Sequence, residues 1–249
     1  ATVSGTYTVT AGGAITDSGT QEIAGVTTIV AGSGNDITLN TSTNNFAAAV
    51  VITSGNNVTL VDEDAIDLGA STVSGTYTLT AGGAVTDTGA LAITGVTTIA
   101  AGSGNNITLD HTSNNFQAAV IITSGNNVTL VDAGAIDLGA STVSGTYAVT
   151  ATAGGDITDS GVLAITGGAT FTVANGRSII LDESSTFSTV TFVPSSGTIA
   201  AVTINSSNAI DLGALTTTGN LTVTAGGAVT DSGTLVIPGT ATISASGQA

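Results

Sequence analysis

Seven aspartates recur at fixed places in the chain, and pairs of carboxylates are what glycoside hydrolysis requires. Four lie in Thr-Asp-Ser/Thr-Gly and three in Ile-Asp-Leu-Gly, at Asp17, Asp87, Asp159, Asp231, Asp67, Asp137 and Asp211. Their recurrence argues against catalysis. An active site is a single cluster of residues, whereas these aspartates lie at equivalent turns that are separated along the array of repeats. Chemistry on acidic sugars would also need a cation, and Arg177 is the only Lys or Arg. We expect no catalytic residue and predict that these aspartates cap turn amides.

Two other features suggest metal chemistry, and neither is complete. Residues 31–39 resemble one copy of the Gly- and Asp-rich nonapeptide that binds calcium in β-rolls, but the next copy carries Asn106 where the first has Asp36. A turn with Asn in a left-handed conformation is the favoured interpretation. His111 is the only histidine, and there is no Cys to complete a ligand set. We therefore expect no metal and no cofactor, and a solvated loop position for His111.

The composition excludes several classes of partner. Seventeen acidic residues and one basic residue give a net charge of -16, so no basic patch for nucleic acid or an anionic membrane surface can form. The longest apolar run, residues 46–52, is far shorter than the roughly 20 residues of a spanning helix. Because the sequence has no Met and no signal-peptide pattern, we expect a processed product or an excised fragment.

The elements that carry these residues are repeats. Residues 1–70 return almost intact as 71–140, diverge in 141–214, and begin again in 215–249. A fixed period of this kind indicates a solenoid, so we expect one β-solenoid domain over 1–249. The most divergent stretch, residues 169–208, contains Arg177 and Pro194, and we interpret it as sequence drift.

Each repeat divides into shorter segments at its Gly, Asn and Asp residues. Residues 6–25, 26–49 and 50–75 each hold three short runs of Val, Ile and Thr. Stacking the segments aligns three apolar columns, Val9/Ile29/Ile52, Ile15/Ile37/Val58 and Ile23/Phe46/Ile66. The pattern predicts a parallel β-helix with three faces, three coils per 70-residue repeat and about ten coils, on the order of 50 Å long. Almost no helix is expected.

Asn and Thr dominate the expected surface. Five Asn pairs at turns are expected to form amide ladders along the axis, namely Asn44-Asn45, Asn56-Asn57, Asn105-Asn106, Asn114-Asn115 and Asn126-Asn127. The Thr-rich residues 6–10 and 76–80 resemble the Thr-x-Thr faces of ice-binding solenoids. Val30 and Val51 interrupt that row, so ice binding remains an alternative with less support.

The amino-acid sequence of the repeats resembles that of a known family. Residues 221–233, together with 104–109 and 126–130, are similar to the repeat regions of very large secreted bacterial proteins of the filamentous haemagglutinin type. The resemblance implies a right-handed parallel β-helix, export from a bacterium, an extracellular or cell-surface location, and a role as a structural stalk or fibre segment of an adhesin. Because the recurring carboxylates form no single constellation, we also expect no enzymatic activity.

Two alternatives stand beside the stalk. One is an extracellular filament subunit that stacks end to end through uncapped coils, and the other is a glycan-binding or glycan-cleaving β-helix. The expected partners are flanking repeats of a longer chain, further copies of this chain, or a glycan or protein of a host or cell surface. Nucleic acid and membrane insertion are not expected.

Overall fold

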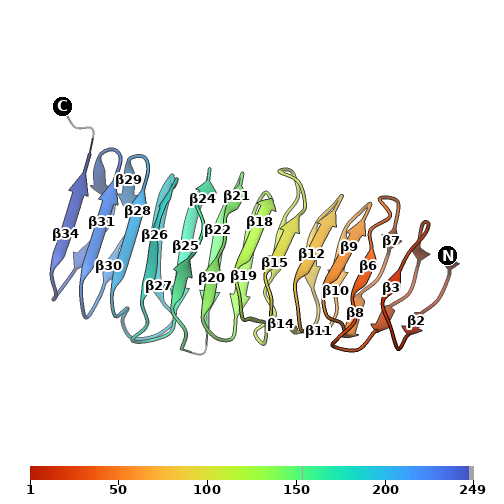
Figure 1. The fold of residues 1–249 in the computed structure, drawn as a ribbon. Coiled ribbons are helices and arrows are strands. Elements are labelled where there is room, and N and C mark those ends of the chain that lie inside the picture. Colours follow the sequence, from red (N-terminus) through yellow and green to blue (C-terminus); the bar gives the residue numbers. More distant parts are fainter. Residues whose placement is uncertain (153, 247–249) are drawn as a thin grey trace.

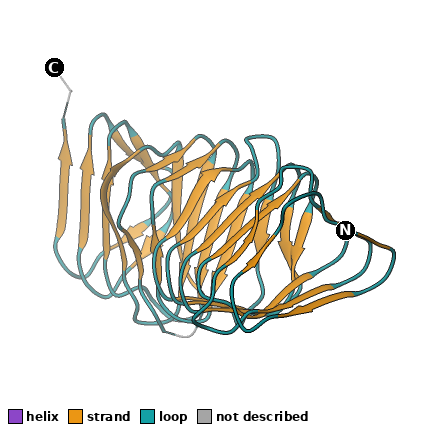
Figure 2. Ribbon diagram, turned by 45° about the vertical axis from the view of Figure 1, so that its right-hand side comes forward, coloured by secondary structure: helices purple, strands orange, loops and turns teal. Residues whose placement is uncertain are grey.

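The protein is an elongated solenoid of stacked, parallel β-strands (Figures 1 and 2). The structure, a computed structural model, describes residues 1–152 and 154–246. The described residues form strands β1 to β34 and no helix, and hence no helix long and apolar enough to cross a membrane. The prediction of an all-β parallel solenoid is confirmed.

Two parallel sheets of 12 strands each, which we name sheet I and sheet II, run along the whole axis. In spatial order sheet I contains β2 (Tyr7–Thr10), β5 (Thr27–Val30), β8 (Val50–Ser54), β10 (Ile66–Leu68), β13 (Val85–Asp87), β16 (Ile107–Leu109), β19 (Val128–Asp132), β22 (Tyr147–Ala151), β25 (Gly168–Val173), β27 (Thr189–Pro194), β29 (Ile210–Leu212) and β32 (Val229–Asp231). Sheet II contains β3 (Ile15–Thr16), β6 (Ile37–Leu39), β9 (Val58–Asp62), β12 (Tyr77–Ala81), β15 (Thr97–Ala100), β18 (Val120–Ser124), β20 (Ile136–Leu138), β23 (Ile157–Asp159), β26 (Ile179–Ser185), β28 (Val202–Ser206), β31 (Leu221–Ala225) and β34 (Ala241–Ala245).

Short third-side strands form four narrow sheets, which we name strips 1 to 4. Strip 1 contains β1 (Thr2–Val3), β4 (Glu22–Ile23) and β7 (Asn45–Phe46), strip 2 contains β11 (Ser71–Val73), β14 (Leu91–Ile93) and β17 (Asn115–Phe116), strip 3 contains β21 (Ser141–Val143) and β24 (Leu163–Ile165), and strip 4 contains β30 (Leu215–Thr216) and β33 (Leu235–Val236). Strips 1 and 3 connect sheet II to sheet I, whereas strips 2 and 4 connect sheet I to sheet II. The strips therefore alternate between the two edges of the solenoid (Figure 1).

Alternation of apolar and polar residues along each strand produces the core, since successive side chains of a strand point to opposite faces. The first two predicted columns are confirmed: Val9 lies opposite Ile29 and Ile29 opposite Ile52, and the column from Ile15 through Ile37 to Val58 is also in register. Thr residues between them face outward.

The third predicted column is only partly correct. Ile23 pairs with Phe46 in strip 1, but Ile66 lies in sheet I, where it pairs with Val85. The reason is that residues 63–65 form a direct turn from β9 to β10, with no third-side strand between them.

The direct turn changes the geometry of the repeat. Between Tyr7 and Tyr77 the chain adds seven strands to the long sheets, so each 70-residue repeat makes three and a half coils rather than three. The solenoid accordingly has about twelve coils instead of ten. Equivalent strands of successive repeats lie on opposite sides, as β2 in sheet I and β12 in sheet II illustrate.

The divergent stretch 169–208 has a distinct core. The ring of Phe171 lies 6.2 Å from that of Tyr147, 6.3 Å from Phe187 and 6.3 Å from Phe192. All four side chains are buried. Much of the chain's small aromatic content is thus packed in neighbouring coils, and the divergence replaces aliphatic packing by aromatic packing in this part of the rod.

Candidate functional site

The Thr-Asp-Ser/Thr-Gly aspartates lie at strand ends, where each carboxylate faces the loop of the next coil. Asp87 Oδ1 accepts a hydrogen bond from the Asp110 amide at 2.9 Å, and its Oδ2 accepts one from Asn114 Nδ2 at 2.6 Å. Asp17 similarly accepts from Asn44 Nδ2 at 2.7 Å and from two loop amides. The predicted capping role is confirmed for these aspartates. Asp231 lies in the last strand of sheet I and accepts no side-chain hydrogen bond within the part of the chain described.

Two buried asparagines bond to Asp17 and Asp87 and complete the corner of the coil, where the strand end meets the loop of the next coil. Asn44 and Asn114 are fully buried, and their Oδ1 atoms accept hydrogen bonds from the Gln21 and Leu91 amides, both at 2.8 Å. Each Asn therefore joins the aspartate of the preceding coil to the first residues of a strip. These Asn pairs do not form the ladders predicted from the sequence.

A second buried aspartate bonds to the last strand of strip 1 and of strip 2. Asp132 Oδ2 accepts from the Phe116 amide at 2.7 Å and Oδ1 from the Gly134 amide at 2.6 Å, while the Ala133 amide donates to the Asn114 carbonyl at 2.7 Å. Asp62 accepts from the Phe46 amide in the same way at 2.8 Å. The side chain occupies the place of a further strip strand, so the edge of the strip is not left unpaired. Sequence analysis missed Asp62 and Asp132, whose only signal is an aspartate at an inward-facing strand position.

The third copy lacks part of this arrangement. Ser185 stands where Asn114 stands in the second copy, and its Oγ accepts from the Leu163 amide at 2.9 Å. Asp159 still accepts from the Asp182 amide at 2.9 Å, but its buried Oδ2 has no partner. A serine hydroxyl is too short to replace the asparagine amide. Burial, reinforced by the neighbouring carboxylates of Asp182 and Glu183, raises the pKa of Asp159 to about 6.

Burial also raises the pKa of Asp62, Asp87 and Asp132, against the opposing effect of their hydrogen bonds. Asp17 lies in the less covered first coil, where burial acts to raise its pKa but the hydrogen bonds from Asn44, Thr41 and Asn40 outweigh it, so its pKa is lowered. The pKa of Asp36 is also lowered, chiefly by the Asn57 amide.

These shifts predict a fold that becomes more stable on mild acidification. A raised pKa means that the folded state binds protons more tightly than the unfolded chain, so stability increases as the pH falls from about 7 toward 4. Below that range Asp17 and Asp36 act in the opposite direction. For Asp159, partial screening by solvent leaves about 1–2 kcal/mol. Urea unfolding at pH 7.5 and pH 5 measures the effect, and the control Asp159→Asn should reduce it without abolishing it; a lower stability at pH 5 contradicts the prediction.

The prediction that the Ile-Asp-Leu-Gly aspartates cap turn amides is wrong, because their carboxylates accept hydrogen bonds from side-chain hydroxyls. Asp67 and Asp137 each accept a hydrogen bond at 2.7 Å, from the hydroxyls of Thr88 and Ser160, and Asp211 accepts one at 2.9 Å from Thr230. Asp67 lies in sheet I and Asp137 in sheet II. Successive copies are therefore on opposite sides of the rod, and the structure does not gather the repeated carboxylates into one constellation.

The loop that resembles a calcium nonapeptide is held to the following coils by hydrogen bonds. Asp36 Oδ1 accepts from the Asn57 amide at 3.1 Å, and Asn57 Oδ1 in turn accepts from the Thr76 amide at 3.0 Å. Asn106 and Asn127 repeat the arrangement, so the predicted ladder is confirmed here. The prediction of a left-handed Asn is wrong: among the described residues only glycines have positive φ, and Gly32 takes that role with φ 88°.

His111 lies in the loop after β16, where its Nδ1 accepts a hydrogen bond from the Ser113 amide at 3.2 Å. Within the described ranges no group of three or more His, Cys, Asp or Glu side chains is placed to hold a metal ion.

Five outward threonines form an uninterrupted row on the first five strands of sheet II. Thr16, Thr38, Thr59, Thr78 and Thr98 lie opposite one another on successive coils. On sheet I, which contains residues 7–10, the predicted interruption is confirmed: Val30 lies opposite Thr10, and Val51 lies opposite Thr28. Two residues further along the strands of sheet II, the outward positions are Val61, Thr80 and Ala100, so the row of threonines is one residue wide.

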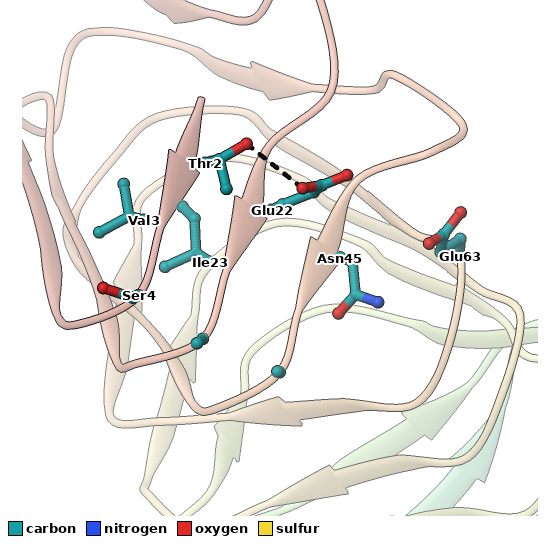
Figure 3. A pocket seen from close by; sticks show the side chains of 9 residues that line it. Thr2, Val3, Ser4, Glu22, Ile23, Asn45 and Glu63 are labelled. Carbon is teal, nitrogen blue, oxygen red and sulfur yellow. Dashed lines mark hydrogen bonds between the residues drawn. The ribbon is translucent and has the colours of Figure 1, made fainter.

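Grooves lie over two strips of the same edge. The groove over strip 1 has a volume of about 420 Å³ and is lined by Glu22, Asn45 and Glu63, among others (Figure 3). The groove over strip 3 has a volume of about 370 Å³ and is lined by neutral side chains, including Thr166 and Ser188.

A family model named Repeats of unknown function (DUF5649) matches residues 1–53, 55–123, 125–193 and 199–249, which is nearly the whole chain. The chain belongs to this family. The two longer DUF5649 matches begin at residues 55 and 125, one 70-residue period apart, so each of these two corresponds to about three and a half coils of the solenoid. No curated protein and no solved structure matches the chain.

Proposed function

We propose that this solenoid is a stalk or fibre segment of a bacterial adhesin, which holds a binding region away from the cell. The observation that carries the proposal is the continuity of the two 12-stranded sheets, which extend through every repeat without an intervening linker. A solenoid of repeats buries each coil only against its neighbours, so its length grows with repeat number. The resemblance to filamentous haemagglutinin repeats supports the adhesin role.

The half-coil offset favours a straight rod. Each strip widens the cross-section at one edge, and the next repeat places its strip at the opposite edge. Any bend that one strip imposes is therefore opposed by the next. The turn ladders from Asp36 to Thr76 and from Asn106 to Thr146 add hydrogen bonds along the axis.

The proposal also assigns the chain a cellular location and its buried aspartates a structural role. We place the chain outside the cell, at the bacterial surface, with further repeats of a longer chain as neighbours of its end coils. Its buried aspartates serve as hydrogen-bond acceptors between coils rather than as catalysts, because their oxygens are directed at backbone amides. Antibodies against the solenoid are expected to label intact cells that carry the gene.

A lengthened chain tests the rod. Inserting one more copy of residues 71–140 after Ala140 keeps the Ala-Ser junction found at Ala70 and Ser71. Three and a half added coils should lengthen the particle by about 17 Å in small-angle X-ray scattering, at an unchanged cross-section. A scrambled insert of the same composition is the control. An inserted copy that leaves the maximum dimension unchanged, or that behaves like the scrambled insert, contradicts the stalk.

A further inference from the structure

The groove over strip 1 is an open surface three strands wide. Glu22 and Asn45 point outward from β4 and β7, with Glu63 on the turn beyond Asn45 (Figure 3). The exposed methyl groups of Ala24 and Ala47 leave the floor shallow and mostly apolar. At the spacing of parallel strands, three strands and the following turn extend over about 14 Å, the length of about four extended residues.

The rim of this groove is negative. Glu22 and Glu63 are both exposed; Glu22 accepts one hydrogen bond, from the Thr2 hydroxyl at 3.2 Å. Asp64, on the same turn, accepts from Asn45 Nδ2 at 3.1 Å. The chain's one basic side chain, Arg177, belongs to the third copy. Among the described residues no Arg, Lys or His side chain forms an ion pair with these carboxylates; the nearest cation is the Ala1 ammonium, which is hydrogen-bonded to Thr20 and Gln21.

The second copy shows that the fold does not need these acids. Ala92 and Ala133 occupy the places of Glu22 and Glu63, yet Ala92 pairs with Asn115 as Glu22 pairs with Asn45. The groove over strip 3 has Ala164 at the same place as Glu22. The carboxylates are therefore an addition to a strip that forms without them.

We propose that the groove over strip 1 binds a basic, extended peptide segment of a partner protein. Its Lys or Arg side chains pair with Glu22 and Glu63, and its small or apolar residues lie over Ala24 and Ala47. Charge complementarity selects this occupant, and the width of the strip sets its length. The inference goes beyond the stalk, since a rod needs no ligand at its edge.

The test uses a fluorescent peptide of alternating Lys and Ala and measures anisotropy at low and at 150 mM salt. The double variant Glu22→Ala with Glu63→Ala reproduces the second copy and should bind about fivefold more weakly, the loss expected for two exposed ion pairs. Asp182→Ala with Glu183→Ala removes the same charge from another exposed site and should leave the affinity near that of the wild type. Equal losses in the two variants would show attraction to net charge alone and overturn the proposal.

A gain of binding provides a second, independent readout. Ala92→Glu with Ala133→Glu installs the same acids on strip 2, at the opposite edge. The number of peptides bound per chain should rise from one to two. Thermal unfolding by circular dichroism checks that each variant is folded. An unchanged stoichiometry in a folded variant would show that the carboxylates and the strip do not form a binding groove.

Discussion

Replacing Phe171 by alanine is expected to lower the free energy of unfolding by about 3–5 kcal/mol, the usual cost of deleting a buried aromatic ring. Phe171 is fully buried and touches the rings of Tyr147, Phe187 and Phe192 across neighbouring coils. The loss removes both the buried area and the edge-to-face contacts. Because each coil is stabilised by its neighbours, the cavity should weaken the coils on both sides. Urea unfolding followed by circular dichroism measures the change.

Thr170→Ala is the matched control, since Thr170 faces outward on the same strand. It should change stability by about 0.5 kcal/mol or less. Hydrogen exchange should also show faster opening of amides in 169–208 for Phe171→Ala than for the control. Equal effects of the two substitutions would mean that the aromatic cluster does not hold this part of the rod together.

The strands and most of the core were predictable, because a period of two in apolar residues fixes which side chains face inward. The column through Val9, Ile29 and Ile52 follows from that alternation alone. The position of Ile66 did not follow, since a direct turn and a third-side strand are both short and polar in sequence. What decides between them is the Asp62 side chain, which closes strip 1 by accepting the Phe46 amide.

The site could be predicted to a similar extent. Asp17 and Asp87 were recognisable as caps because Asp followed by Ser or Thr and then Gly is typical of turns. Asn114 was not distinguishable from Asn126 or Asn127, since all three stand in Asn-Asn pairs, yet Asn114 is buried whereas the other two lie on turns. The opposite placement of successive copies was also hidden, because near-identical sequences give no indication of which sheet each one joins.

Asn114→Ala should be among the most damaging polar substitutions, costing about 3–4 kcal/mol. It removes the donor to Asp87 Oδ2 and the acceptor for the Leu91 amide, both buried. A charged hydrogen bond and a neutral one are lost together, and a desolvated carboxylate oxygen remains. The cost should shrink at pH 5, where Asp87, whose pKa burial already raises, can take up a proton. Chemical denaturation at pH 7.5 and pH 5 measures both effects.

Ser185, at the equivalent position of the third copy, suggests a substitution of intermediate effect at position 114. Asn114→Ser copies Ser185, which still accepts the strip amide but leaves Asp159 Oδ2 without a donor, so its cost should fall between zero and that of alanine, at about 1–2 kcal/mol. Asn115→Ala, at the exposed neighbour, should cost about 0.5 kcal/mol or less. If serine and alanine at position 114 destabilise equally, the acceptor for the Leu91 amide has no measurable value. The corner would then depend on the aspartate contact alone.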